Sequence, residues 1–349
     1  MRVLFLTNSL EVGGVETNLV GLVRELHKRG HEIWVASAGG PLTGDVVRAG
    51  AIHRRMSLSL YTPLGLAAGI WAVRRLNQRH RFDVVHALSA AGNMATQAVP
   101  RRSNDAPLVV SSPMGLQNSD HEPAFVTTLR NRLIVLRAER VLLISEEIAR
   151  SVTALRVPAT RLVRCDVVGI DIARFASGAP SAAAMRHEFG ISETAPVVTT
   201  IGALHPRKSH HLFLEMVARL RERRPDLRAL VVGGGPQLAA LGQQALRLGI
   251  AETVTFTGPR GDIAAILAMT DVYVKPGVVE GFVGITVLEA MAANVPVVAF
   301  DTRDVRAAII PDATGLIVPA SDVAALESTV DRLLRDPKLR RALVVRAHQ

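Results

Sequence analysis

Short apolar runs alternate with amphipathic helical segments along this chain, and the same alternation occurs in both of its halves. In the first half, residues 3–7 form an apolar run that is followed by a glycine loop and a helical pattern. In the second half, residues 197–201 are followed in the same way by a loop and the helical pattern of residues 212–220. Such alternation is typical of β-α-β units with parallel strands. The sequence therefore predicts an α/β fold with two doubly wound parallel sheets.

Apolar runs of four or five residues, mostly rich in Val, Ile and Leu, mark the predicted strands. In the first half they are residues 3–7, 32–36, 83–87, 108–111 and 141–144. In the second half they are residues 197–201, 228–232, 253–256, 271–274 and 295–299. In sheets of this kind ligands bind beyond the carboxyl ends of the strands, so the loops at those ends are where chemistry is expected.

The length of 349 residues suits two domains. Residues 174–187 are rich in Ala, Ser, Gly and Pro, a composition that favours a linker. We therefore expect one domain over residues 1–175 and a second over residues 176–349.

Composition excludes several classes of protein. With 48% hydrophobic and 21% charged residues the chain is not intrinsically disordered, and 4% aromatic residues argue against a base-stacking nucleic-acid module. Cys165 is the only cysteine, which leaves no intrachain disulfide and no cysteine-cluster metal site. His205, His210 and His211 match no zinc-binding spacing, so no tightly bound metal is expected. The apolar start is too short for a signal peptide, and residues 64–73 are too short for a membrane span, so we expect a cytoplasmic protein.

The positive charge is concentrated in the first half. Residues 1–175 hold 22 Lys and Arg against 14 Asp and Glu, whereas residues 176–349 hold 19 against 17. One interpretation is a surface that meets an anionic membrane or a phosphorylated acceptor, with the apolar and Arg-rich residues 63–81 as the membrane contact. The other is that the arginines are solvated on helix faces, and both stay open.

The segment of residues 271–299, DVYVKPGVVEGFVGITVLEAMAANVPVVA, reads as strand, glycine loop, helix, turn and strand. Gly281 and Gly284 allow a ligand close to the backbone, and the amides at the following helix start attract phosphate. Glu280 lies at the mouth of that helix. Glu289 lies within it between apolar neighbours, where a carboxylate needs a partner such as a ribose diol.

Two further positions carry candidate chemistry. Arg207 and Lys208 stand just before a helix, where cations oppose the helix dipole unless an anion binds there. His86 lies near the carboxyl end of the predicted strand of residues 83–87, and a catalytic and a structural role for it are both open.

These segments resemble the GT4 family of retaining glycosyltransferases, which have the GT-B fold, over nearly the whole chain. EGFVGITVLEAMA carries most of the resemblance, although eight residues separate Glu280 from Glu289 where the family has seven, as if Val283 were inserted. The opening with Gly13-Gly14, VVGGGPQLAAL and TFTGPR are also similar. In IGALHPRKSHHLFL the family's lysine is matched by Lys208, but its arginine falls on Ala203.

The resemblance implies transfer of a sugar from a nucleotide diphosphate sugar, UDP by default, to an acceptor hydroxyl with retained anomeric configuration and without a required metal. It implies that the first domain binds the acceptor and the second the donor. The catalytic residues so implied are Glu280, Lys208, Arg207 and His86. The donor-binding residues so implied are Gly13, Gly14, Glu16, Gly258, Gly281, Phe282, Gly284 and Glu289.

Two alternatives remain beside this hypothesis. A nicotinamide-dependent oxidoreductase is disfavoured because no G-x-G-x-x-G motif follows either leading strand. A non-catalytic binding subunit of the same fold is kept open by Ala203 and by the extra residue near Val283. The oxidoreductase would use NAD as its cofactor. For the transferase we expect no nucleic-acid partner, and we expect a location in the cytoplasm or at the inner face of the membrane.

Overall fold

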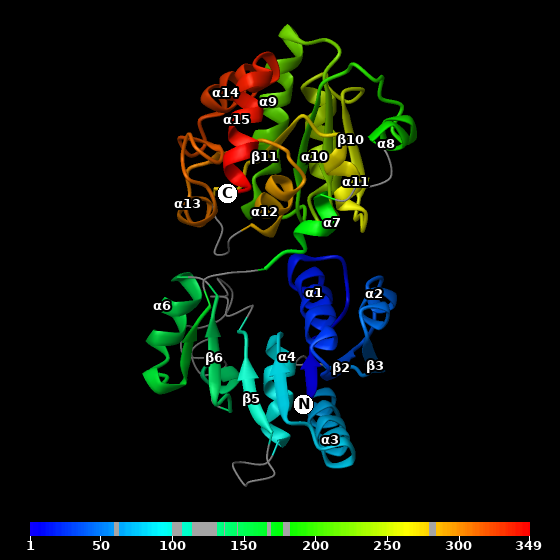
Figure 1. The fold of residues 1–349 in the computed structure, drawn as a ribbon, viewed down its shortest axis with the longest axis vertical. Helices are drawn as coiled ribbons and strands as arrows, with labels where there is room; N and C mark the ends of the chain where they lie inside the picture. Colours follow the sequence, from blue (N-terminus) through cyan, green and yellow to red (C-terminus); the bar gives the residue numbers. More distant parts are fainter. Residues whose placement is uncertain are drawn as a thin grey trace. The chain divides into compact units, whose positions relative to one another are not determined.

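The structure is a computed structural model that describes residues 1–58, 63–99, 107–113, 131–135, 137–144, 146–165, 169–176, 182–278 and 284–349. The chain divides into two compact units, Met1–Gly169 and Ile170–Gln349. Each unit is built on a parallel sheet (Figure 1). Residues 170–175, which the sequence places in the first domain, lie with the second unit.

The first unit contains a sheet of seven described strands, and all of their pairings are parallel. In sheet order the strands are β3 (Ala51–Arg55), β2 (Glu32–Ser37), β1 (Arg2–Leu6), β4 (Val84–Ala87), β5 (Leu108–Ser111), β6 (Arg140–Leu143) and β7 (Leu162–Arg164). Among the described residues, the helices with complete bounds are α1 (Gly14–Lys28), α2 (Thr43–Arg48), α3 (Pro63–His80), α4 (Ala90–Ala95) and α6 (Glu146–Ala154), with short 3-10 turns η1 (Thr96–Ala98) and η2 (Ala159–Arg161).

The second unit contains six described strands, again all parallel. In sheet order they are β10 (Val254–Gly258), β9 (Arg228–Val232), β8 (Val197–Ile201), β11 (Val272–Lys275), β12 (Val297–Phe300) and β13 (Leu316–Val318). The helices are α7 (Ile172–Ala176), α8 (Ala182–Glu188), α9 (His210–Arg223), α10 (Leu238–Arg247), α11 (Ile263–Ala268), α12 (Ile285–Ala292), α13 (Arg303–Ala308), α14 (Val323–Arg335) and α15 (Pro337–Ala347), with the 3-10 turn η3 (Pro206–Lys208).

Both faces of the second sheet are buried, which explains why its strands are nearly continuous apolar runs. Alternate residues of β11 show this directly, because Val272 and Val274 enter the core beneath α9 and α14 whereas Tyr273 enters the core beneath α12. The doubly wound parallel architecture predicted from the sequence is therefore confirmed.

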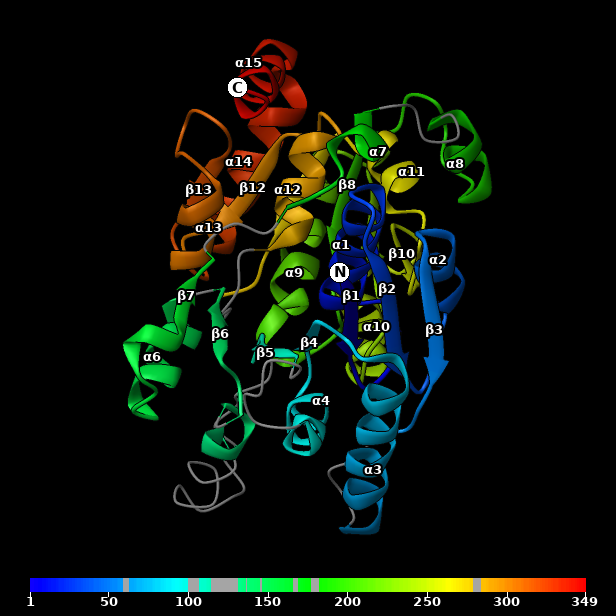
Figure 2. The ribbon, with the colours of Figure 1, turned by 60° about the horizontal axis from the view of Figure 1, so that its bottom comes forward.

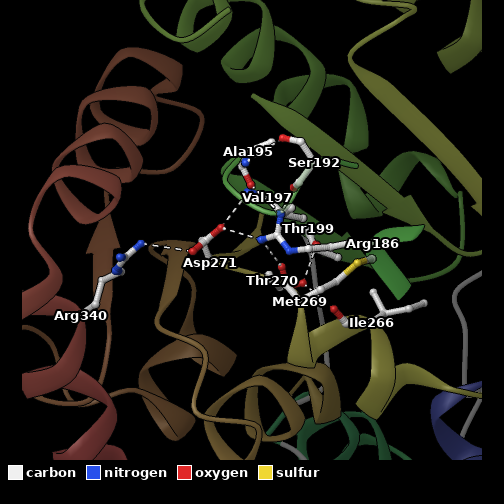
Figure 3. Close-up of polar contacts among 10 residues, drawn as sticks. All are labelled: Arg186, Ser192, Ala195, Val197, Thr199, Ile266, Met269, Thr270, Asp271 and Arg340. Atoms are coloured by element: carbon white, nitrogen blue, oxygen red, sulfur yellow. Dashed lines mark hydrogen bonds and ion pairs between the residues drawn. The ribbon is translucent and has the colours of Figure 1, made fainter. Parts of the chain in front are cut away.

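A polar network ties the amino edge of the second sheet together (Figure 3). Asp271 accepts a hydrogen bond from the Val197 amide at 2.9 Å, and its carboxylate lies 3.7 Å from the guanidinium of Arg186 and 3.4 Å from that of Arg340. Arg186 also donates to the carbonyls of Ser192 and Ala195, both at 2.8 Å. These contacts join α8 and α15 to the start of β8 and β11. They brace the edge opposite to the one where ligands bind in such sheets.

Three strands and one helix differ from the sequence prediction. β3, β7 and β13 were not predicted. α8 begins at Ala182 and so occupies the last six residues of the segment 174–187, which the sequence assigned to a linker. Met185 of α8 is buried in the core, and this burial stabilises a helix there.

Candidate functional site

The strand order of the second sheet reverses at β8 and β11. From β8 the chain winds outward through β9 and β10, and from β11 it winds the other way through β12 and β13. Ligands of open α/β sheets bind at the carboxyl end of such a reversal. The loops that follow β8 and β11, together with the neighbouring loops after β9 and β10, therefore form the candidate site.

Glycines allow the loops after β8, β9 and β10 to approach each other backbone to backbone. Gly233 has φ of +139°, and an added Cβ would lie 2.0 Å from the Gly202 carbonyl oxygen. Gly235 has φ of +155°, and its Cβ would lie 2.6 Å from the Leu204 carbonyl oxygen. The Gly233 amide donates to the Gly258 carbonyl at 3.0 Å. Only glycine fits these positions, so the edge of the sheet is a closely joined backbone surface.

Lys208 and Arg207 lie in η3, directly above the end of β8. An added Cβ on Gly202 would lie 4.0 Å from Cδ of Lys208, so the lysine stem turns back over the strand end, while Arg207 is exposed. Ser209 follows in the left-handed conformation, with φ of +52°, and α9 begins at the next residue. The two cations therefore stand at the carboxyl edge, where a diphosphate could bind to them.

Glu289 is a buried carboxylate within the apolar helix α12. The residue is 6% exposed, and burial raises the pKa of its carboxyl group to about 7, against the opposing positive charge of Arg174. Among the described residues no hydrogen bond reaches this carboxylate, and none of the side chains placed in the structure forms an ion pair with it. A buried carboxylate without such a bond is costly. A ligand that donates two hydroxyl hydrogen bonds would satisfy it.

Lys275 ends β11 beside the start of α12 and is not among the site residues expected from the sequence. It is 4% exposed, and an added Cβ on Gly284 would lie 2.8 Å from its Cε. Gly284 is the N-cap of α12 and contributes no side-chain cap. The signal in the sequence was a lysine that closes an otherwise apolar strand, VYVK.

The remaining candidates in this segment, Glu280, Gly281 and Phe282, lie outside the described residues, which stop at 278 and resume at 284. Their assigned roles stay predictions.

Three of the candidates in the first unit, Gly13, Gly14 and Glu16, lie at the start of α1. Gly13 is the N-cap in an extended conformation, and Gly14 is the first helical residue. An added Cβ on Gly13 would lie 2.6 Å from Oε2 of Glu16, so this carboxylate turns back onto the helix start. Burial raises the pKa of Glu16, while a hydrogen bond from its own backbone opposes the rise. The start of α1 follows β1. The strand order of the first sheet reverses between β1 and β4.

His86 lies on β4 and is enclosed within the first unit. Its Nε2 is 2.8 Å from Oγ of Ser112, and its ring centroid lies 5.3 Å from that of Phe5. Burial lowers the pKa of the imidazole to about 4, so the ring is neutral at pH 7. These contacts are those of a satisfied core histidine. A catalytic role for His86 stays a prediction.

The first unit should lose stability in acid because of His86. The pKa of His86 in the folded state, about 4, lies below the ordinary 6.5. The stability that the neutral His86 contributes is therefore fully present above pH 6.5 and is lost as the pH falls toward 4. The loss is at most about 3 kcal/mol. Both tryptophans, Trp34 and Trp71, lie in this unit, so their fluorescence in urea unfolding reports on it.

His86→Gln provides the comparison. We expect the difference in unfolding free energy between wild type and this variant to be smaller at pH 4.5 than at pH 7. A difference that is independent of pH would contradict the assignment of a buried neutral histidine.

None of the described helices is long and apolar enough to cross a membrane. Within the same residues no group of three or more His, Cys, Asp or Glu side chains could hold a metal ion.

Comparisons with protein families match both units. Residues 181–349 match the family described as "Glycosyl transferases group 1", and residues 13–165 match the "Glycosyl transferase 4-like domain".

Two relatives and one solved structure give the range of similarity. The chain is 30% identical over 353 aligned positions to "D-inositol 3-phosphate glycosyltransferase" of Mycobacterium marinum, covering 93% of this chain and 74% of that protein. It is 38% identical over 186 residues to "GDP-mannose-dependent alpha-(1-6)-phosphatidylinositol monomannoside mannosyltransferase" of Mycolicibacterium smegmatis, covering 51% of this chain and 48% of that protein. Anabaena Alr3699/HepE in complex with UDP-glucose has a TM-score of 0.83 at 20% identity, covering 99% of this chain and 93% of that chain. This last likeness establishes the shared fold, with two parallel-sheet units.

Proposed function

Because the chain belongs to the group 1 glycosyl transferases of family GT4, which transfer sugars from nucleotide sugars, we propose that it is a retaining enzyme that uses a UDP-sugar. The observation that carries the proposal is the buried Glu289 carboxylate of α12, the helix that follows β11, with its pKa raised to about 7. The ribose diol of the donor supplies the two hydrogen bonds that this group lacks among the described residues.

The loops around Glu289 support the rest of a donor site. Lys208 and Arg207 bind the diphosphate, and the amides at the start of α12 after Gly284 add their partial positive charge. The joined glycine loops, with Gly258, frame the nucleotide base. We assign Glu280, Gly281 and Phe282 to the sugar and phosphates, as expected from the sequence, and Gly13, Gly14 and Glu16 to the diphosphate side of the donor.

We propose the reaction that the resemblance to retaining enzymes of this fold implies. The bond between the anomeric carbon and the diphosphate oxygen breaks, and the acceptor oxygen forms a new bond to the same face of that carbon. The acceptor proton passes to the leaving diphosphate, so no carboxylate nucleophile is needed. The task of the protein is to orient the two substrates and to stabilise the charge that grows on the diphosphate, which Lys208 and Arg207 do.

The acceptor is anionic or membrane-associated, with the first unit as its binding unit. The positive excess in residues 1–175 supports this. The names of the two relatives point the same way, because one is named for D-inositol 3-phosphate and the other for a phosphatidylinositol mannoside, and both carry phosphate. We place the enzyme in the cytoplasm, at the inner face of the membrane.

A thermal-shift comparison of UDP, GDP, ADP and NAD tests the proposal. A ligand at about a hundred times its dissociation constant stabilises a protein by roughly 2.7 kcal/mol. We expect UDP to stabilise the second unit most. A shift with GDP alone would overturn the choice of base, since one relative is named for GDP-mannose. A shift with NAD alone would support the oxidoreductase alternative, and no shift at all would support a binding subunit without transfer activity.

A further inference from the structure

One side of α3 combines exposed apolar side chains with exposed arginines. Leu64 is 85% exposed and Trp71 is 60% exposed, although both are large apolar residues. The exposed positions of α3 recur every three or four residues, so they share one side of the helix. We call this side the α3 face; it consists of Leu64, Ala67, Ala68, Trp71, Arg74, Arg75, Gln78 and Arg79. Its first half is apolar and its second half is cationic.

The opposite side of α3 holds the helix on the first unit. Val73 is fully buried and Leu76 is 9% exposed, and both belong to the core on that side of the sheet. Arg2 donates to the His80 carbonyl at 3.0 Å, and the ring of His80 lies 4.3 Å from that of Trp34. In Figures 1 and 2, α3 (light blue) lies at the margin of the first unit beside α4. The α3 face is therefore the solvent side of a firmly anchored helix.

The segment of the chain that contains this face carries formal charge of one sign. Between Asp45 and Asp83 the sequence contains seven arginines and no acidic residue, and all seven are exposed. Within the face, the Arg75 guanidinium lies 5.2 Å from the ring centroid of Trp71, which keeps a cation and an apolar ring side by side. A surface of this kind is complementary to an anionic partner that also accepts apolar side chains.

We propose that the α3 face docks on the surface of an anionic lipid bilayer. Leu64 and Trp71 enter the boundary between headgroups and acyl chains, and Arg74, Arg75 and Arg79 pair with lipid phosphates. A nucleic acid or an acidic protein would satisfy the arginines but would leave the exposed apolar half without a partner. The apolar half is the reason that a bilayer fits better.

The direction of α3 connects docking with the proposed reaction. The helix follows β3 and precedes β4, and because the sheet is parallel it runs from the carboxyl edge of the first sheet back to the amino edge. Its apolar half is thus the half nearer the carboxyl edge, where ligands bind in such sheets. Docking there would present that edge to a lipid-linked acceptor. This purpose rests on the proposed function, whereas docking itself does not require transfer activity.

Vesicle sedimentation with the full chain tests the docking surface. The variant Arg74→Gln, Arg75→Gln, Arg79→Gln is compared with Arg219→Gln, Arg247→Gln, Arg346→Gln, which removes three exposed arginines from the second unit and leaves the same net charge. Vesicles consist of phosphatidylcholine alone or mixed with phosphatidylglycerol. We expect the α3 variant to bind the anionic vesicles about 100-fold more weakly than wild type, from roughly fivefold for each arginine. The control should lose less than about tenfold.

Fluorescence tests the apolar half of the face. Anionic vesicles should shift the tryptophan emission of wild type to shorter wavelength, and Trp71→Ala should abolish the shift because only Trp34 remains. The proposal would be overturned if the two triple variants bound anionic vesicles equally, or if wild type bound neutral and anionic vesicles equally. It would also be overturned if wild type showed no emission shift, or bound heparin more tightly than the anionic vesicles. The thermal shift with nucleotide separates the two proposals: if it is lost while vesicle binding stays, only the proposed function fails.

Discussion

Glu289→Gln is expected to weaken binding of the donor nucleotide by about tenfold to a hundredfold, because two hydrogen bonds from the ribose diol to a charged acceptor become bonds to a neutral amide. Titration calorimetry with the nucleotide that gives the largest thermal shift measures the change. Donor binding requires the carboxylate form, and the pKa of Glu289 in the free protein is about 7. Wild-type affinity should therefore fall about tenfold for each pH unit below 7. The variant should lack this dependence.

The same substitution should make the ligand-free protein more stable at alkaline pH. The folded pKa of about 7 lies above the ordinary 4.5, so the fold favours the protonated form. The stability contributed by Glu289 is therefore greatest below pH 4.5 and is lost as the pH rises from 4.5 to 7, by at most about 3 kcal/mol. We expect Glu289→Gln to exceed wild type by about 1–3 kcal/mol at pH 8 and to match it near pH 4.5.

Glu327→Gln is a matched control. Glu327 is also a helical carboxylate of the second unit with 7% exposure, but it lies 3.3 Å from the guanidinium of Arg223. Its substitution should leave nucleotide affinity unchanged and should lower stability slightly, because the ion pair with the half-exposed Arg223 is lost. If Glu289→Gln also lowered stability at pH 8, or left nucleotide affinity intact, the ribose site would be misassigned.

Lys208→Ala is expected to lower kcat/KM for sugar transfer by about 100-fold to 1000-fold, the usual range when a group that stabilises developing charge is removed. Because Lys208 is assigned to the diphosphate, the variant should also lose the preference for UDP over UMP in thermal shifts. Lys208→Arg keeps the charge and should retain part of the activity. Lys338→Ala, which removes an exposed lysine of α15, should change neither quantity. Unchanged turnover in Lys208→Ala would refute the site assignment.

The elements that the sequence located correctly are those with a strong local pattern. β5, β8 and β9 have the predicted bounds, because buried central strands of a parallel sheet are continuous apolar runs. The sequence prediction missed β3, β7 and β13. β7 and β13 contain only three residues each, and β3 carries a histidine and two arginines. β3 and β7 are also the edge strands of the first sheet. At an edge one side of the strand is solvated, so the apolar pattern weakens.

The predicted linker shows a different limit. Gly, Ser and Pro before α8 signalled a loop, but Ala182–Glu188 is helical. Alanine is the best helix former, and Met185 gains burial against residues distant in the chain. The prediction from local composition therefore extended the loop into residues that are helical.

The sequence by itself determined the doubly wound architecture and the family, since these depend on local periodicity and residue type. The residues that it assigns to a nucleotide sugar stay predictions. The tertiary structure alone decided three things. It enclosed His86 against Ser112 and Phe5, it placed Lys275 beside Gly284, and it brought Gly233 into backbone contact with Gly202. The reason is the same for each: burial, pKa and close approach depend on atoms contributed by segments far apart in the chain, and no local pattern records which segments will meet.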